Sequence, residues 1–315
     1  MRSTWARIRR DRAALFGLAV IAVIAFAALF APFVAPFNPD QQFANGLTLQ
    51  GAPRPPDSIY WFGTDLLGRD LLSRLIWGAR ASMIIGLVAN LAAVAIGTTL
   101  GATAGFLGGW AGTVIMRFTD LMMAFPALLL AIALAAILHP SLWIVALVIA
   151  LVNWVQIARV IYTETRALAA REFVEAVRAL GAGRWRILTR HVLPHLVPTI
   201  LVWGTLGISS TVLLEATLSF LGVGVQPPTP SWGGIIFQSQ SYFMVAPWLI
   251  VFPGLAIILL ALSFNLVGDA LRDALDPTQR GGSGVMVSNH HALVFVWRSI
   301  SWLWRIAPRF RQKSY

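Results

Sequence analysis

The sequence predicts an all-α integral membrane protein with six transmembrane helices, and three observations lead to this fold class. Hydrophobic residues make up 57% of the 315 positions and charged residues only 12%, whereas about a quarter of the residues in soluble domains are charged. The mean hydropathy of +0.73 agrees with this composition. Apolar runs of about 20 residues, long enough to cross the bilayer core as helices, recur along the chain.

Six apolar runs define the predicted spans. They lie at residues 13–36, 81–106, 115–138, 142–161, 199–222 and 247–268. The first run has too long an apolar region for a signal peptide, so we predict an uncleaved anchor. The resulting organisation is a cytoplasmic N-terminus at 1–12, an anchor at 13–36, an extracytoplasmic loop at 37–80, a five-span core at 81–277 and a basic aromatic tail at 278–315.

Arginine placement predicts the orientation of the spans. Five arginines among residues 2–12 place the N-terminus in the cytoplasm, and six spans then return the C-terminus to the same side. Residues 222–247 contain no charged side chain, as expected of an outside segment, whereas the 37–80 loop balances four arginines with four aspartates. The net charge is +11, and the arginines that produce it lie between apolar runs. This placement indicates membrane topology, and we expect no nucleic-acid partner.

A basic segment at 162–198 interrupts the apolar sequence between the fourth and fifth spans. From Thr165 to Leu180, apolar residues recur at helical spacing and charged residues occupy another face, which predicts a short amphipathic helix with Glu175 in reach of arginines one turn away. Gly181 then supplies the left-handed backbone that often ends a helix. The residues alone favour two interpretations about equally: a basic loop at the lipid headgroups, or a helix that docks in a groove of another protein.

The sequence EAVRALGAGRWRILTRHVLP, residues 175–194, resembles the EAA loop in the membrane subunits of bacterial ABC importers. The residues that fit its pattern are Glu175, Ala176, Gly181, Leu193 and Pro194. Val177 departs from the usual second alanine, and His191 replaces a common isoleucine in a way that resembles the dipeptide/oligopeptide/nickel branch. The resemblance implies a cytoplasmic coupling helix seated in a cleft of an ATPase subunit, with Glu172, Arg178 and Ala182 as further members.

Three other segments resemble the same branch: residues 62–82, 215–236 and 252–277. The first contains an extracytoplasmic signature of Gly63, Thr64, Asp65, Gly68, Arg69 and Asp70. Asp65 with Arg69, and Asp70 with Arg74, are each four residues apart with the acid first, which predicts two ion pairs. We expect an interfacial helix that braces the second span, or alternatively an element that contacts the binding protein or lines the entrance.

Polar residues within predicted spans are expensive and indicate function. Glu215 is the main candidate for the translocation pathway, with Asn153 and Asn265 as further candidates. An equally favoured alternative for Glu215 is a hydrogen bond to a partner permease. Arg117 and Asp120, three residues apart near the inner end of the third span, are predicted to pair with each other.

Several chemistries are excluded by composition. The chain has no cysteine, and its single lysine, Lys313, lies in the tail, so the chain cannot contain a P-loop for nucleotide. His191 and His195 have a spacing that could hold a metal, but no carboxylate or thiol supports them. No nucleophile lies with a base in any span, so we expect no enzyme activity, no cofactor and no metal site.

The resemblance implies a permease subunit that forms the pathway for peptides in a bacterial inner membrane, and the missing P-loop indicates that the chain does not bind ATP itself. The resemblance implies a second homologous permease, two ABC ATPase subunits and an extracytoplasmic substrate-binding protein as partners. Nickel, glutathione or oligosaccharide import are alternatives within the same group. A secondary transporter driven by an ion gradient and a membrane scaffold are alternatives from other classes. For the 278–315 tail, a flexible linker followed by a helix at the membrane surface is predicted, and the alternatives are a disordered tail or a reading-frame artefact with no role.

Overall fold

The computed structural model describes residues 9–138 and 141–275, and the predicted tail lies outside this part of the chain. Within it, five helices are long and apolar enough to cross a membrane, or six if the bent pair α5 and α6 is one span. The five are α2 (Arg12–Leu29), α4 (Leu71–Leu107), α7 (Leu142–Ala169), the helix at 184–220 that contains α10 (Leu193–Phe220), and α12 (Trp248–Leu275). The all-α membrane fold is therefore confirmed.

The predicted 37–80 loop ends earlier than expected, because α4 begins at Leu71. The Asp70 carboxylate accepts hydrogen bonds from the Ser73 N–H at 2.7 Å and from its hydroxyl at 2.6 Å, which caps the helix. The predicted interfacial helix is thus not a separate element. Its second half is the first turns of α4, and residues 64–70 form the turn before it. A four-residue helix, α3 (Ala31–Val34), precedes the loop.

The predicted third span is broken in two. Helices α5 (Gly109–Ala124) and α6 (Ala127–Ile137) meet at an angle of 89°. Phe125 between them is extended, with φ −88° and ψ 133°, and it precedes Pro126. Proline disfavours helical backbone in the residue before it and cannot donate a hydrogen bond, so the break has a local cause.

The segment between α7 and α10 contains three short helices: α8 (Glu172–Ala179), α9 (Arg184–Ile187) and the π-helix η1 (Leu188–Val192). The helix predicted over 165–180 is interrupted at Ala170 and Arg171, so its first part belongs to α7. Pro194 and Pro198 lie inside the continuous helix, which begins well before residue 199, the predicted start of the fifth span. The π-helical turn ends two residues before Pro194, whose missing N–H breaks the α-helical pattern.

Glycines on α4 allow an unusually close approach of α7. Gly97, Gly101 and Gly105 recur every fourth residue and face α7. A methyl group on Gly101 would lie 2.5 Å from the backbone oxygen of Ala158. Small residues at this spacing let two membrane helices pack backbone to backbone. Among the described residues, α4 and α7 accordingly form the most extensive helix pair.

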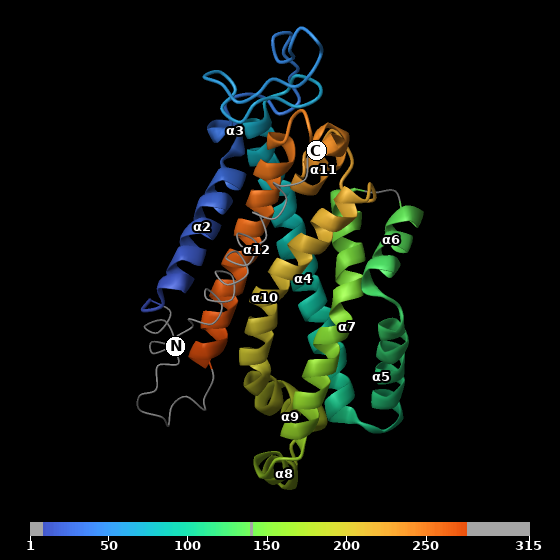
Figure 1. Cartoon of the computed structure of the whole chain (residues 1–315). Helices are drawn as coiled ribbons and strands as arrows, with labels where there is room; N and C mark the ends of the chain where they lie inside the picture. The colour runs from blue at the N-terminus through green and yellow to red at the C-terminus, as the bar shows by residue number, and fades with distance from the viewer. Residues whose placement is uncertain (1–8, 139–140, 276–315) are drawn as a thin grey trace, which may run out of the picture. The chain divides into compact units, whose positions relative to one another are not determined.

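The remaining helices pack around α4 and α10. Helix α12 lies between α2 and α10, and α11 (Trp232–Ser239) packs against both α10 and α12 before the short 3-10 turn η2 (Gln240–Tyr242). Within residues 9–275, α8 lies at one end of the helices and the loop before α4 lies at the other (Figure 1). The two segments that carry the sequence motifs are therefore at opposite ends of α4 and α7.

Candidate functional site

Helix α8 is attached to the other helices by its apolar side. Val174 is 0% exposed and packs in a cluster that includes Ile161 of α7, Val192 of η1 and Leu196 of α10. The ring of Phe173 lies 5.3 Å from that of His195, measured between centroids. The helix is thereby fixed to both of the long helices that it connects.

The charged side of α8 points away from these helices. Glu172, Glu175 and Arg178 are exposed, together with Ala176. The predicted ion pairs of Glu175 do not form, since none of the ion pairs in the described part of the chain includes a residue of α8. Short side chains and unpaired charges on one exposed face suit contact with another protein.

Gly181 ends α8 as its sequence predicts. Its φ of +82° lies in the left-handed region, and its N–H donates to the Arg178 carbonyl at 3.0 Å. The N–H of Ala182 donates to the Val177 carbonyl at 3.3 Å. This closed turn leaves the exposed end of α8 free, whereas the EAA-like residues Leu193 and Pro194 lie further on, in the first turn of α10.

A polar contact that the sequence did not indicate joins the two long helices beside α8. The Thr199 hydroxyl of α10 donates to Glu164 Oε2 of α7 at 2.8 Å. The two residues are 35 positions apart, so no local pattern predicts their contact. Together with the packing of Val174, it ties α7, α8 and α10 into one assembly.

The predicted extracytoplasmic signature folds into a buried polar turn at the opposite end of α4. Gly63 and Gly68 have φ of +78° and +70°, which glycine adopts without strain. The Thr64 hydroxyl accepts from the Arg54 N–H at 2.8 Å and donates to the Gly46 carbonyl at 2.5 Å. These bonds connect distant parts of the loop, so the first role of the motif is to fold the loop itself.

One of the two predicted ion pairs in this motif forms and the other is replaced. Arg69 Nε lies 2.7 Å from Asp65 Oδ2, as predicted. Asp70 caps α4 instead of pairing with Arg74, and Arg74 Nε lies 3.3 Å from Asp65. The prediction of an Asp70–Arg74 pair was wrong because the cap and the pair compete for the same carboxylate.

Two aspartates of this loop have shifted acidities. Burial raises the pKa of the Asp70 carboxyl, although the hydrogen bonds from Ser73 act against the shift. A hydrogen bond from the Tyr60 N–H lowers the pKa of Asp57, which also pairs with Arg54 at 2.8 Å. The pKa values of the two carboxyl groups are therefore shifted in opposite directions.

The three predicted pathway residues lie in different environments. Glu215 is 0% exposed, and its carboxylate accepts from the Ser82 hydroxyl at 3.1 Å and from the Ser219 hydroxyl at 2.8 Å. Asn153 is half-buried and donates to Thr211 at 3.3 Å, whereas Asn265 is exposed. Glu215 is therefore buried within this chain, where Ser82 of α4 and Ser219 of α10 hydrogen-bond its carboxylate.

Two further polar groups connect membrane helices. Asp120 of α5 pairs with Arg117 at 3.8 Å, as predicted, and also with Arg159 of α7, which the sequence did not single out. Asn90 of α4 donates to the Gly204 carbonyl of α10 at 2.8 Å. These bonds tie neighbouring helices together.

His195, one half of the suggested histidine pair, faces Phe173, and the described residues contain no group of three potential metal ligands.

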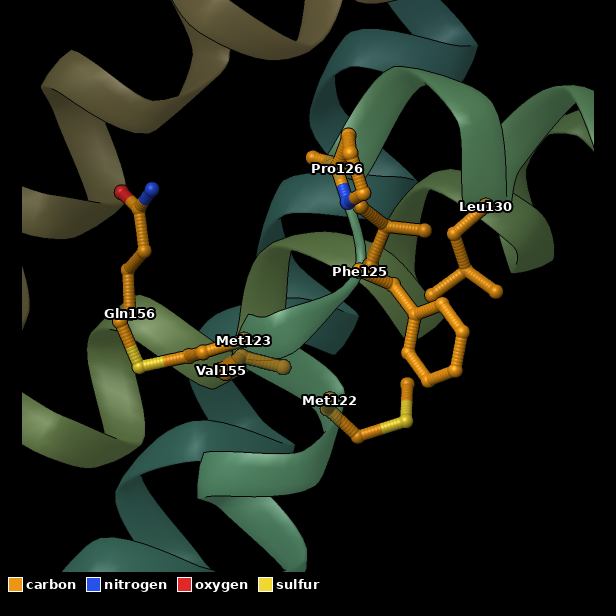
Figure 2. Close-up of a pocket in the computed structure, with 9 residues that line it drawn as sticks. Met122, Met123, Phe125, Pro126, Leu130, Val155 and Gln156 are labelled. Atoms are coloured by element: carbon orange, nitrogen blue, oxygen red, sulfur yellow. The ribbon is translucent and has the colours of Figure 1, made fainter.

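A pocket of about 240 Å³ lies at the bend between α5 and α6. Figure 2 shows Phe125 and Pro126 at the connection of the two helices, with Met122 and Met123 on the turn before it and Gln156 on α7. The bend thus exposes an apolar surface with a single amide on its far wall.

Comparison with known proteins identifies the family. A family model described as "Binding-protein-dependent transport system inner membrane component" matches residues 97–281, and one described as "N-terminal TM domain of oligopeptide transport permease C" matches residues 1–52. Among solved structures, a chain of the methionine ABC transporter MetNI, in an inward-facing conformation, superposes with a TM-score of 0.54 at 17% identity. The superposition covers 64% of this chain and 97% of that one, and it shows that the fold is shared.

Curated relatives cover nearly the whole chain. The dipeptide transport system permease protein DppC of Alkalihalophilus pseudofirmus is 40% identical over 89% of this chain and 90% of its own length. The glutathione transport system permease protein GsiD of Pectobacterium atrosepticum is 40% identical over 88% and 90%. The di/tripeptide transport system permease protein DppC of Pseudomonas aeruginosa is 43% identical over 88% and 92%. The chain therefore belongs to the family of inner membrane components of binding-protein-dependent ABC transport systems.

Proposed function

We propose that this chain is one of two homologous permease subunits in an ABC importer for peptides. Its relatives are permeases of dipeptide, di/tripeptide and glutathione transport systems, which favours short peptides as the solutes. The partners would be a second permease, two ATPase subunits and an extracytoplasmic binding protein. The N-terminus and α8 would face the cytoplasm, and the loop before α4 the outside.

The observation that carries the proposal is the geometry of α8. Its apolar side is fixed to α7 and α10, while its charged side is exposed and makes no ion pair within the described part of the chain. A helix held in this way would transmit the displacement of a docked protein to the membrane helices. Nucleotide binding in the ATPase subunits would thereby bias the pathway between its inward-open and outward-open states.

Copurification tests the docking role of α8. We expect the chain, purified in mild detergent, to retain an ATPase subunit, and we expect Glu175→Arg to lose it because the reversed charge faces the partner. Gln50→Arg is the control, since it also places an added arginine on the surface but at an exposed position in the loop at the other end of α4. Equal retention by both variants would contradict the docking assignment.

Uptake tests the substrate class and separates the alternatives. Cells that contain the complete transporter should accumulate a labelled dipeptide in an ATP-dependent manner, with a defined binding protein required. Competition by glutathione, Ni²⁺ or an oligosaccharide would identify another solute of the same group. Uptake that collapses with the proton or sodium gradient while ATP remains would favour a secondary transporter instead.

A further inference from the structure

A second pocket, of about 350 Å³, lies between the polar turn before α4 and helix α11. It is separate from α8 and from the bend between α5 and α6. Its polar wall consists of Arg69, Arg74 and Asp65, with the Gln238 amide opposite. Its apolar wall includes Leu67 and Ile235. The pocket thus combines two guanidinium groups with apolar side chains, at the end of α4 where the loop lies.

Arg74 is unusual in this wall because it is buried without sufficient acceptors. Only 2% of the residue is exposed, and its Nη1 reaches the Pro39 carbonyl at 3.4 Å, near the limit for a hydrogen bond. Its Nε lies 3.3 Å from Asp65 Oδ2, close enough for an ion pair but not aligned for a hydrogen bond, so this N–H has no acceptor. A buried arginine normally has its donors satisfied, because an unsatisfied charged donor is costly.

Asp65 cannot satisfy both arginines. Its Oδ1 already accepts from the backbone N–H groups of Leu67 and Arg69, and its Oδ2 accepts from Arg69 Nε at 2.7 Å. Two guanidinium groups therefore share one carboxylate in the pocket wall, which leaves a net positive charge there.

The other nearby acids do not fill this role. Asp70 is held by Ser73 as the cap of α4, and Asp40 is exposed and lies 4.0 Å from Arg74 Nη1. The remaining contact of Arg69, from Nη2 to Gln238 Oε1, is 3.5 Å long. An additional acceptor inside the pocket would complete the hydrogen bonding of both arginines.

We propose that this pocket binds a carboxylate group. A planar carboxylate matches the two-donor edge of a guanidinium, and the apolar wall suits the organic group to which the carboxylate is attached better than a hydrated inorganic anion. The carboxylate belongs either to the transported solute or to an acidic side chain of an extracytoplasmic partner. The inference rests on the pocket itself and stands whatever solute the chain transports.

A fluorine label can report binding directly, because the chain has no cysteine of its own. Leu67→Cys places a thiol at the pocket, where the side chain is 48% exposed, and a trifluoroethyl tag adds little bulk there. The labelled chain in lipid nanodiscs is titrated with N-acetylglycine while the ¹⁹F spectrum is recorded. We expect a saturable shift with N-acetylglycine and at least tenfold weaker binding of N-acetylglycinamide, which lacks the charge. Equal shifts with both compounds, or none, would overturn the proposal.

Gln238→Glu supplies a matched internal competitor. The substitution is nearly isosteric and places a carboxylate beside Arg69, so it should abolish the response to N-acetylglycine while the chain stays folded. Gln240→Glu adds the same charge at an exposed position outside the pocket and should respond as the parent does. Unchanged binding by Gln238→Glu would contradict the site.

Two additions identify the natural source of the carboxylate. If it belongs to the solute, a free dipeptide shifts the ¹⁹F signal and its amidated form does not. If it belongs to a partner, the unloaded binding protein shifts the signal and displaces N-acetylglycine. Each result supports the carboxylate site and assigns its ligand.

Discussion

The ring of Phe173 on α8 lies beside the imidazole of His195 on α10, with 5.3 Å between ring centroids. This contact joins the exposed helix to the first turn of a transmembrane helix. We expect Phe173→Ala to reduce uptake severalfold while ATP hydrolysis continues, because α8 can then move without moving α10. Phe173→Tyr preserves the ring and should retain uptake. The ratio of solute transported to ATP hydrolysed measures the effect, and an unchanged ratio in Phe173→Ala would show that this contact transmits nothing.

Substitutions of Gly181 can distinguish the effect of backbone strain from that of a steric clash. Its φ is +82°, yet a methyl group built on it would meet no atom within 4 Å. Gly181→Asn should therefore retain uptake, since asparagine tolerates left-handed backbone, whereas Gly181→Val should distort the turn at a cost of about 1–2 kcal/mol. Gly181→Pro should uncouple ATP hydrolysis from uptake without preventing membrane insertion, because it also loses the bond to Arg178. Equal uptake in all three variants would argue against a role of this turn in coupling.

Close packing of α4 on α7 predicts different outcomes for two chemically identical substitutions. Gly101→Ala should lower the melting temperature of the purified chain, because its methyl group would lie 2.5 Å from a backbone oxygen of α7. Gly254→Ala, in α12, meets no atom within 4 Å and should be neutral or stabilising by up to about 1 kcal/mol. Thermal unfolding in one detergent compares the two. The packing argument fails if Gly101→Ala is as stable as Gly254→Ala.

The serines around Glu215 predict that its charge is dispensable. A hydroxyl both donates and accepts, so Ser82 and Ser219 can also bond the amide of Glu215→Gln, and uptake and stability should stay close to those of the parent. Glu215→Ala leaves these buried hydroxyls without their acceptor and should be destabilised by about 1–3 kcal/mol. If Glu215→Gln folds normally but loses uptake, the carboxylate acts in the pathway, and the pathway assignment gains support.

Asp70 predicts a specific dependence on pH. Its pKa is raised by burial, so as the pH falls from neutral the folded chain takes up a proton before the unfolded chain does. Its contribution to stability should therefore grow on acidification and be lost as the pH rises through the raised pKa. Asp70→Asn does not titrate and retains a cap on Ser73. The melting temperature of the parent should improve relative to Asp70→Asn between neutral pH and about 4, and parallel profiles would contradict the shift.

The centres of the spans were predictable and several of their ends were not. Twenty consecutive apolar residues suffice to indicate a membrane helix, but the start of α4 depends on which partner Asp70 takes. Capping competes with the i,i+4 pair, and the choice is settled by Arg74 turning to Asp65 in the folded loop. The bend at Pro126 had a local signal in the proline, which a count of apolar residues overlooks.

The features of the candidate sites were likewise predictable only where they depend on neighbouring residues in the sequence. The end of α8 at Gly181 followed from local backbone preferences, and its φ confirms it. The surroundings of Glu215 could not be predicted, because Ser82 lies 133 residues away in sequence. The coupling role of α8 and the pathway role of Glu215 stay predictions, and both now have defined contacts that mutations can test.

The row of glycines on α4, Gly97, Gly101 and Gly105, has a mechanical consequence. Because α4 and α7 touch backbone to backbone over successive turns, the pair resembles a stiff rod more than two independent helices. One end of the rod bears the polar turn of the loop, and the other leads into α8 (Figure 1). Tilting such a rod shifts both ends at once and in opposite directions. A gate at one membrane surface and a second gate at the other would then need no chain of side-chain contacts between them, because both would move with the same rigid pair of helices.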